Sequence, residues 1–371
     1  MNLLLIPTTN HIITSWSEVY NNFTDNGHKV YTILDNKFIN KEFPSDFIKL
    51  ELFAMRLHQL DQLSSMQKLF IVLYLNIYAK QILKKYSIDT IVVSNDNALV
   101  ANIFINNAKK LNKKTILHQA AGVLNKPIKI SFLQQLKLKL KTFMFNLSSS
   151  PNIGNDVDLC LLQGEYWAKY IDNKNYKIVG NDYFRTFNKK IKSIKQTDIL
   201  EFKKNINLGN KKLVVFFSQP SKELKMASDK NIKSLYNDIK YLETKLLEND
   251  DYLFIFKPHP QEYYYKEFNF KNIIKDIDIN LLVASSDICL TIFSTMAIQS
   301  KIAGKKTLGY LPDYFDDNLV NYLKSVFDFH SNNIENILKS IFSDVQEQQK
   351  DFSKLVDLSL NTKELVYKEL I

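Results

Sequence analysis

The sequence YLFIFKPHP (252–260), followed by ASSDICLTIFSTMAIQSKIAGKKTLGYL (284–311), contains the segments that decide the fold. Residues 252–256 and 288–293 are short apolar runs, which predict strands buried on both faces, and residues 305–310 predict a third strand. The intervening residues 294–303 predict a helix that Gly304 ends. Strands and helices that alternate in this way predict a doubly wound α/β domain with a parallel sheet.

Polar side chains follow these strands where they end. His259 lies between two prolines, which stiffen the loop and present the imidazole just past a carboxyl strand end, where open α/β sheets bind ligands. Ser294 is the expected N-cap of the next helix, and its hydroxyl, that of Thr295 and the free backbone N–H groups suit a phosphate. The competing interpretations are a histidine explained by packing and two plain capping residues.

Other residues near these strand ends join the candidate nucleotide site. Ser218 and Gln219 follow the predicted strand 212–217, Lys257 can add charge beside a phosphate, and Glu262 can hold a ribose hydroxyl. A lysine before such a loop is also commonly just exposed. The complete set of nucleotide- and phosphate-binding candidates is Ser218, Gln219, Lys257, Pro260, Glu262, Ser294 and Thr295, with His259 as a catalytic candidate.

The order of strand, His-Pro pair, strand, Ser-Thr helix start, Gly-Lys pair and strand resembles the C-terminal nucleotide-binding domain of GT-B glycosyltransferases that build bacterial surface polysaccharides. His259-Pro260 and Ser294-Thr295 resemble the HP and Ser/Thr motifs of bacterial sialyltransferases and polysialyltransferases, in which the histidine serves the departing phosphate of CMP and the Ser/Thr pair binds it. CDP-glycerol glycerophosphotransferases share the outline. The acidic-acidic-glycine motif that usually holds the sialyltransferase base is absent from this sequence.

The resemblance implies the GT-B fold, with two doubly wound Rossmann-like domains facing a cleft and C-terminal helices crossing back. It implies an inverting, metal-independent glycosyltransferase that needs no cofactor and moves a sugar, from a CMP-sugar by preference, to a lipooligosaccharide or capsule acceptor. The alternatives are a GT-B-shaped glycerophosphotransferase, a sugar-nucleotide epimerase or hydrolase, and a non-catalytic nucleotide-binding protein. Fold alone does not separate these functions.

The N-terminal half starts with a β–α–β pattern and continues with further strands that end in polar residues. Asp96 follows the predicted strand 89–94 and is interpreted either as a catalytic base or as a helix N-cap. His118 ends the strand 114–117, on the same sheet edge, and is a candidate on the acceptor side or a histidine satisfied by backbone carbonyls. Asp182, in a Gly-Asn-Asp corner after the strand 176–179, is the second acceptor-side candidate.

Length and composition predict a soluble two-domain protein. The chain has 371 residues, of which 45% are hydrophobic and 24% charged. We expect an acceptor-side domain at 1–190, a polar linker at 191–210, a nucleotide-binding domain at 211–330 and C-terminal helices at 331–371. Cys160 and Cys289 lie in apolar runs and are expected to be buried free thiols, as in a reducing cytoplasm. No residue cluster has metal-ligand spacing, and no apolar run is long enough to span a bilayer.

The charge distribution is uneven. Residues 97–155 contain no Asp or Glu but nine lysines, against a net charge of +10 for the whole chain. Within this window, segment 131–147 has leucines and a phenylalanine at helical spacing, flanked by lysines. Such a helix can bind peripherally to an anionic inner-membrane surface, or it can be a core-facing helix with a solvated lysine face. Nucleic acid is not expected as a partner, because arginine-rich or aromatic-interleaved motifs are missing.

Overall fold

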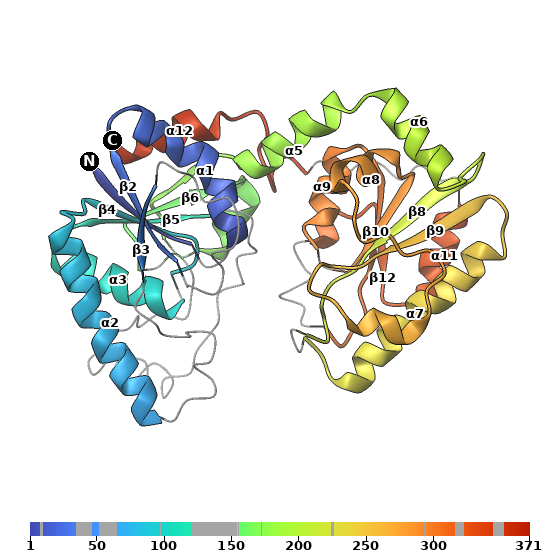
Figure 1. Cartoon of the computed structure of the whole chain (residues 1–371), viewed down its shortest axis with the longest axis horizontal. Helices are drawn as coiled ribbons and strands as arrows, with labels where there is room; N and C mark the ends of the chain where they lie inside the picture. The colour runs from blue at the N-terminus through green and yellow to red at the C-terminus, as the bar shows by residue number, and fades with distance from the viewer. Residues whose placement is uncertain are drawn as a thin grey trace. The chain divides into compact units, whose positions relative to one another are not determined.

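The computed structural model describes residues 1–7, 10–34, 47–51, 65–96, 98–119, 154, 156–171, 173–223, 226–292, 294–315, 323–343 and 352–371. These residues form two compact units (Figure 1). Unit 1 comprises Met1–Tyr183 and Ser353–Ile371, and unit 2 comprises Phe184–Phe352. Segment 131–147, for which the sequence predicts either a membrane-binding helix or a core-facing helix with a solvated lysine face, lies outside the described residues.

Unit 1 is built on a parallel sheet with the strand order β3-β2-β1-β4-β5-β6-β7. The chain adds strands to one side of β1 and then returns to add the rest on the other side. Because crossovers between parallel strands are right-handed, this reversal places α1 on one face of the sheet and α3 on the other, as Figure 1 shows. The elements of unit 1 are β1 (Asn2–Ile6), α1 (Asn10–Asp25), β2 (Lys29–Leu34), β3 (Ile48–Glu51), α2 (Ser65–Lys85), β4 (Thr90–Val93), α3 (Leu99–Lys110), β5 (Lys114–His118), β6 (Leu159–Leu162), the 3-10 helix η3 (Glu165–Tyr170), β7 (Tyr176–Ile178) and α12 (Thr362–Leu370).

The end of the chain completes unit 1. Residues 353–361 run past β6 and β7, where the Trp167 indole N–H donates to the Leu355 carbonyl (2.8 Å). Gly164 lies against this segment, and a Cβ there would approach the Lys354 carbonyl oxygen to 2.4 Å, so only glycine fits. Helix α12 then packs on α1, with the rings of Phe23 and Tyr367 4.9 Å apart. The C-terminal segment is therefore part of the unit 1 core.

Unit 2 is a second parallel sheet, with the order β12-β11-β10-β8-β9. Here too the order of strand addition reverses, since β9 is added on one side of β8, whereas β10 to β12 extend the sheet on the other side. Its elements are α5 (Asp182–Ser193), α6 (Gln196–Asn205), β8 (Lys212–Phe217), α7 (Asp229–Leu247), β9 (Tyr252–Lys257), the 3-10 helix η4 (Tyr264–Phe268), α8 (Ile279–Ser285), β10 (Ile288–Thr291), α9 (Met296–Ile302), β11 (Lys306–Tyr310), the 3-10 helix η5 (Leu323–Ser325), β12 (Phe329–Ser331) and α11 (Ile334–Phe342).

The two doubly wound sheets confirm the predicted α/β architecture. The strands read from apolar runs are nearly fully buried, as expected for parallel strands covered on both faces. Both cysteines are free and buried, as predicted. Strands β3 and β12 were not predicted, because each is only three or four residues long and lies at a sheet edge.

The chain segment that joins the two sheets contains helices where we predict a polar linker. Residues 196–205 form α6, and Phe202, Ile206 and Leu208 pack with Leu213 in the core of unit 2. Helix α5 starts with Asp182 in unit 1, and its Phe187 belongs to that same core. The segment is rich in lysine because α6 exposes most of its surface. Its polar composition is therefore compatible with a helix that packs on unit 2 through a few apolar side chains.

No helix of the described residues is both long and apolar enough to cross a membrane.

Candidate functional site

The carboxyl edge of the unit 2 sheet gathers the candidate nucleotide-binding residues. Thr291 at the end of β10 pairs with Phe217 of β8, which pairs in turn with Lys257 of β9, so the three strands end in one row. The chain adds β9 on one side of β8 and β10 on the other, so the order of strand addition reverses between β8 and β10. Open α/β sheets bind ligands at such a switch point. The loops that start at Ser218 and at Ser294 lie on its two sides. The row places His259 one strand further along the same edge.

The Glu262 side chain accepts several hydrogen bonds within and around the loop that carries His259. Its carboxylate is 3% exposed and accepts hydrogen bonds from the Ser218 hydroxyl (2.7 Å), the Tyr236 hydroxyl and the His259 backbone N–H (2.8 Å). The Glu262 N–H donates back to the His259 carbonyl (2.9 Å). Both carboxylate oxygens are therefore occupied by the protein. Glu262, for which we predict a ribose contact, connects the His259 loop to Ser218 after β8 and to Tyr236 of α7.

Burial controls protonation in this loop. Desolvation raises the pKa of Glu262 from 4.5 to about 7, although its three hydrogen-bond donors lower it. Desolvation also lowers the pKa of the half-buried His259, and the nearby Lys257 lowers it further. His259 Nδ1 accepts the Gln261 N–H (3.2 Å), so the neutral ring carries its proton on Nε2. That nitrogen can donate a hydrogen bond to a ligand oxygen.

The last residue of β9, Lys257, forms hydrogen bonds to backbone carbonyls. Lys257 Nζ donates to the carbonyls of Lys275 (2.9 Å) and Pro258 (3.2 Å), and burial lowers the pKa of this lysine. The ammonium thus stabilises the loop backbone in this structure. Pro260 is exposed at the loop tip, and Gln219 is half-buried beside the buried Ser218.

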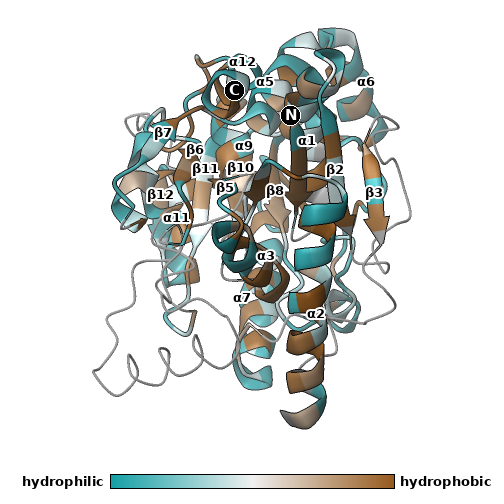
Figure 2. Cartoon of the chain, turned by 90° about the vertical axis from the view of Figure 1, so that its left-hand side faces the viewer, coloured by the Kyte–Doolittle hydropathy of each residue, from teal (hydrophilic) through white to brown (hydrophobic). Residues whose placement is uncertain are grey.

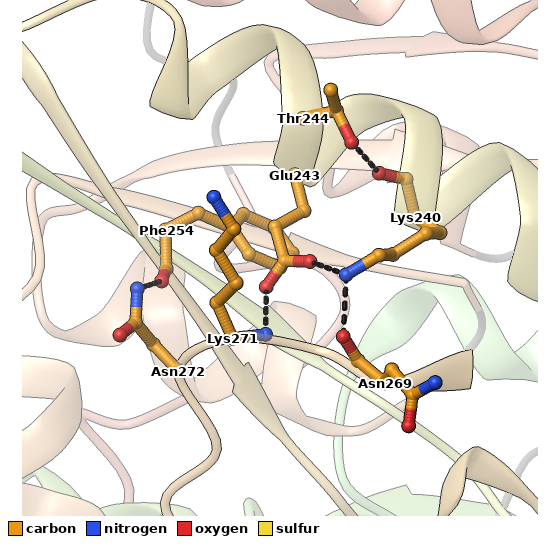
Figure 3. A network of polar contacts seen from close by, with 7 residues as sticks. All are labelled: Lys240, Glu243, Thr244, Phe254, Asn269, Lys271 and Asn272. Atoms are coloured by element: carbon orange, nitrogen blue, oxygen red, sulfur yellow. Dashed lines mark hydrogen bonds and ion pairs between the residues drawn. The ribbon is translucent and has the colours of Figure 1, made fainter. Parts of the chain in front are cut away.

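A second carboxylate ties the later part of the same loop to α7 (Figure 3). Glu243 is buried and accepts from the Lys271 N–H (2.7 Å) and from Lys240 Nζ (2.5 Å). Lys240 also donates to the carbonyl of Asn269 (2.6 Å), a residue in the left-handed conformation with φ 47°. Helix α7 therefore holds the excursion after β9 at two points, through Tyr236 and through Glu243.

The Ser294-Thr295 pair lies at the start of α9. Thr295 directly precedes the first residue of α9, has helical φ and ψ values and makes no side-chain capping hydrogen bond. Ser294 Oγ accepts the Met296 N–H (3.2 Å), which is the hydrogen bond expected of the predicted N-cap. The Thr295 hydroxyl is thus not used for capping.

In unit 1 the corresponding reversal lies between β1 and β4, and Asp96 follows β4 there. Asp96 is 1% exposed, its Oδ2 accepts the Gly154 N–H (2.8 Å), and its Oδ1 has no hydrogen-bond partner among the residues that the structure describes. Desolvation raises the pKa of Asp96 from 3.8 to about 6; the Gly154 N–H lowers it and the charge of Asp156 raises it. Ala98, and not Asp96, is the N-cap of α3, so the capping interpretation is wrong.

His118 is enclosed in an aromatic cluster. Its Nδ1 bonds the Tyr20 hydroxyl (2.9 Å), and its ring stacks on Trp16 with centroids 5.5 Å apart. Burial lowers the pKa of His118 to about 3, so the ring is neutral at physiological pH. The partner is therefore a side chain rather than the backbone carbonyl that we predicted as the alternative.

A row of buried amides at the same edge escaped the sequence analysis. Gln119 Oε1 accepts the Gln163 N–H (3.2 Å), and Gln163 Oε1 accepts from Asn181 Nδ2 (2.9 Å). These residues follow β5, β6 and β7, and each is at most 3% exposed. The recurrence of an amide after consecutive strands was the available signal. Asp182, next to this row, is buried in the first turn of α5.

Across the described part of the chain, no group of three or more His, Cys, Asp or Glu side chains could hold a metal ion.

The architecture is of the GT-B type, and comparison with solved structures identifies similar folds over the whole chain. The UDP-GlcNAc 2-epimerase of Neisseria meningitidis bound to UDP-GlcNAc matches with a TM-score of 0.63 at 13% identity, over 100% of this chain and 99% of that one. The UDP-GlcNAc 2-epimerase of Methanocaldococcus jannaschii matches with a TM-score of 0.61 at 14% identity, over 100% and 99%. The wall teichoic acid polymerase TagF matches with a TM-score of 0.54 at 14% identity, over 100% and 89%.

No protein-family model matches the sequence. No curated protein matches it either.

These matches correct the functional expectation. We expected a CMP-sugar glycosyltransferase from the His-Pro and Ser-Thr pairs, but the matching folds are those of UDP-GlcNAc 2-epimerases. The two pairs occupy strand ends that any nucleotide-binding sheet of this type can use, so they indicate the architecture and not the reaction. The sugar-nucleotide epimerase that we held as an alternative fits the comparisons better.

Proposed function

We propose that this protein is a sugar-nucleotide epimerase that acts on a uridine diphosphate N-acetylhexosamine. The observation that carries the proposal is the Asp96 carboxylate, which is buried at the switch point of unit 1, has a pKa of about 6 and has one oxygen without a hydrogen-bond partner among the described residues. The whole-length fold similarity to UDP-GlcNAc 2-epimerases supports the substrate class.

An epimerase removes a proton from a carbon and returns one to the opposite face, so it requires general acid–base groups. The best catalytic pKa lies near the working pH, and Asp96 is ionised above about pH 6 yet protonated often enough to act as an acid. We assign Asp96 to proton transfer. His118 is neutral and sequestered by Trp16 and Tyr20, which suits a positioning role better than proton transfer.

In unit 2 we assign nucleotide binding to the carboxyl ends of β8, β9 and β10. The Ser294 and Thr295 hydroxyls and His259 Nε2 are the proposed phosphate ligands, since a neutral imidazole with a protonated Nε2 is a hydrogen-bond donor. Gln219 is the proposed nucleoside contact. Lys257 contributes positive potential to the same edge while its ammonium holds the loop.

The test is hydrogen exchange at carbon. The protein is incubated with UDP-GlcNAc in D₂O, and proton NMR follows both loss of a sugar C–H signal and formation of the epimer. Wild type should show both, and Asp96→Asn should slow them about 100-fold to 10,000-fold. UDP should raise the melting temperature more than CMP, with a stabilisation of about 2.7 kcal/mol at 100 times its Kd. Absence of exchange in a folded, UDP-stabilised protein would reject the epimerase assignment.

The match to the teichoic acid polymerase favours a second candidate, a glycerophosphotransferase. That function predicts a larger stabilisation by CDP-glycerol than by UDP-GlcNAc, and no exchange of sugar C–H protons. The same two measurements therefore separate the candidates.

A further inference from the structure

Helix α2 presents an apolar stripe to solvent. Its exposed large hydrophobic residues are Met66 (62% exposed), Phe70 (64%), Leu73 (46%) and Ile77 (61%). Their spacing of four, three and four places them on one face of the helix. The opposite face is the one buried in unit 1, through Ile71, Val72, Leu75, Ala79, Ile82 and Leu83. The helix is therefore apolar on two sides, and most of α2 in Figure 2 has hydrophobic colouring.

This stripe is not explained by the core, because the core uses the other face. Four large side chains at helical spacing form a contiguous patch, unlike singly scattered surface hydrophobics. From Met66 to Ile77 the stripe extends about 16 Å along the helix axis, at 1.5 Å per residue. A patch of this length can contact an extended apolar surface along about three turns of the helix.

The surroundings of the stripe are strongly basic. Helices α2 and α3 together contain six lysines and no acidic residue. Lys80 and Lys84 continue the exposed face of α2 beyond Ile77, and Lys110 ends α3 beside it. All three lysines are exposed, so an anionic partner can reach their charges.

A hollow between the two helices joins the stripe to these lysines. It has a volume of about 360 Å³ and is lined by Asn76, Ile77, Lys80, Asn107, Lys110 and Leu111. Asn107 Nδ2 donates to Asn76 Oδ1 (3.0 Å), which fixes the floor of the hollow across the two helices. The hollow thus offers two ammonium groups beside one apolar stripe residue.

We propose that the α2 stripe docks the protein on an anionic lipid membrane, with the α2–α3 hollow taking a phosphate-bearing headgroup. Apolar side chains with flanking lysines and no acids are the pattern of a helix that lies in the plane of the membrane interface. A second copy of this chain fits less well, because a symmetric contact would bring the same lysines of both copies together without a counter-charge. This surface contains no residue of segment 131–147, and the proposal does not depend on the proposed reaction.

The experiment is co-sedimentation of the full chain with vesicles of phosphatidylglycerol and phosphatidylcholine, compared with phosphatidylcholine alone. Wild type should bind the anionic vesicles, release as salt rises, and bind neutral vesicles weakly. Phe70→Gln with Ile77→Gln should lower the affinity at least tenfold, since two partly buried apolar anchors are removed. Lys80→Gln with Lys110→Gln should lower it about 30-fold at low salt, five- to sixfold for each lysine.

Leu200→Gln is the matched control, because Leu200 is 58% exposed on α6 and has no comparable stripe around it. It should bind like wild type. Circular dichroism and melting temperature establish that each variant is folded. Equal binding by wild type and both double variants would overturn the proposal. A salt-independent dimer in sedimentation velocity that Phe70→Gln with Ile77→Gln dissociates, without vesicle binding by wild type, would also overturn it and assign the stripe to a second copy.

Discussion

The stability of unit 1 in Asp96→Asn relative to wild type should be higher at neutral pH than in acid. The wild-type carboxyl is buried with a pKa of about 6, against 3.8 when exposed. Because the folded pKa is raised, ionisation destabilises the native state, and stability falls as pH rises from the lower value through the higher one. The difference corresponds to about 3 kcal/mol in total, of which about 2 kcal/mol is lost between pH 4.5 and pH 8.

The asparagine removes this dependence and keeps the key acceptor. Its side-chain oxygen can take the Gly154 N–H that Asp96 Oδ2 accepts at 2.8 Å. Any cost of burying its NH₂ group is the same at every pH. The gain of Asp96→Asn over wild type should therefore be about 2 kcal/mol larger at pH 8 than at pH 4.5, whatever its absolute value.

Urea unfolding followed by tryptophan fluorescence measures this effect in unit 1 alone. The chain has two tryptophans, Trp16 and Trp167, and both are buried in unit 1. Asp25→Asn is the control, since Asp25 is an exposed carboxylate on α1 and such substitutions change stability by about 0.5 kcal/mol or less. A stability difference between Asp96→Asn and wild type that does not change with pH would refute the buried, ionised carboxylate.

Further predictions concern unit 2. Glu262→Ala leaves three buried donors without an acceptor and should lower the free energy of unfolding of unit 2 by at least about 3 kcal/mol, measured by calorimetry. Asp328→Ala should lower the free energy of unfolding by about 3 to 5 kcal/mol in the same assay. It leaves the buried ammonium of Lys301, which lies 2.5 Å from Asp328 Oδ1, without its counter-charge. Ser294→Ala with Thr295→Val should weaken UDP binding by about 1 to 3 kcal/mol in titration calorimetry; unchanged affinity would remove both from the phosphate site. His259→Ala should lower turnover about 10-fold to 150-fold in the NMR assay, the loss expected for one hydrogen bond to a charged phosphate, while the melting temperature stays near that of wild type.

The amino-acid sequence by itself determined the elements and the layering. Apolar runs such as 213–217 and 288–291 are strands, because runs this short that are bounded by polar or turn residues suit a strand buried on both faces, and the helical segments between them favour a parallel sheet. It also placed Asp96, His118 and His259 near strand ends, since this depends only on where each apolar run stops.

Only the tertiary structure decided what those side chains do. Glu262, whose predicted ribose contact stays a prediction, has a structural role because Ser218 and Tyr236, 44 and 26 residues away in the chain, meet at its carboxylate. His118 became a buried, neutral ring because α1 brings Trp16 and Tyr20 against it. The pKa of Asp96 follows from the desolvation that the surrounding fold imposes, and α2 keeps an exposed stripe because unit 1 packs against its other face. Protonation, pairing and exposure are set by neighbours distant in sequence, so local pattern cannot supply them.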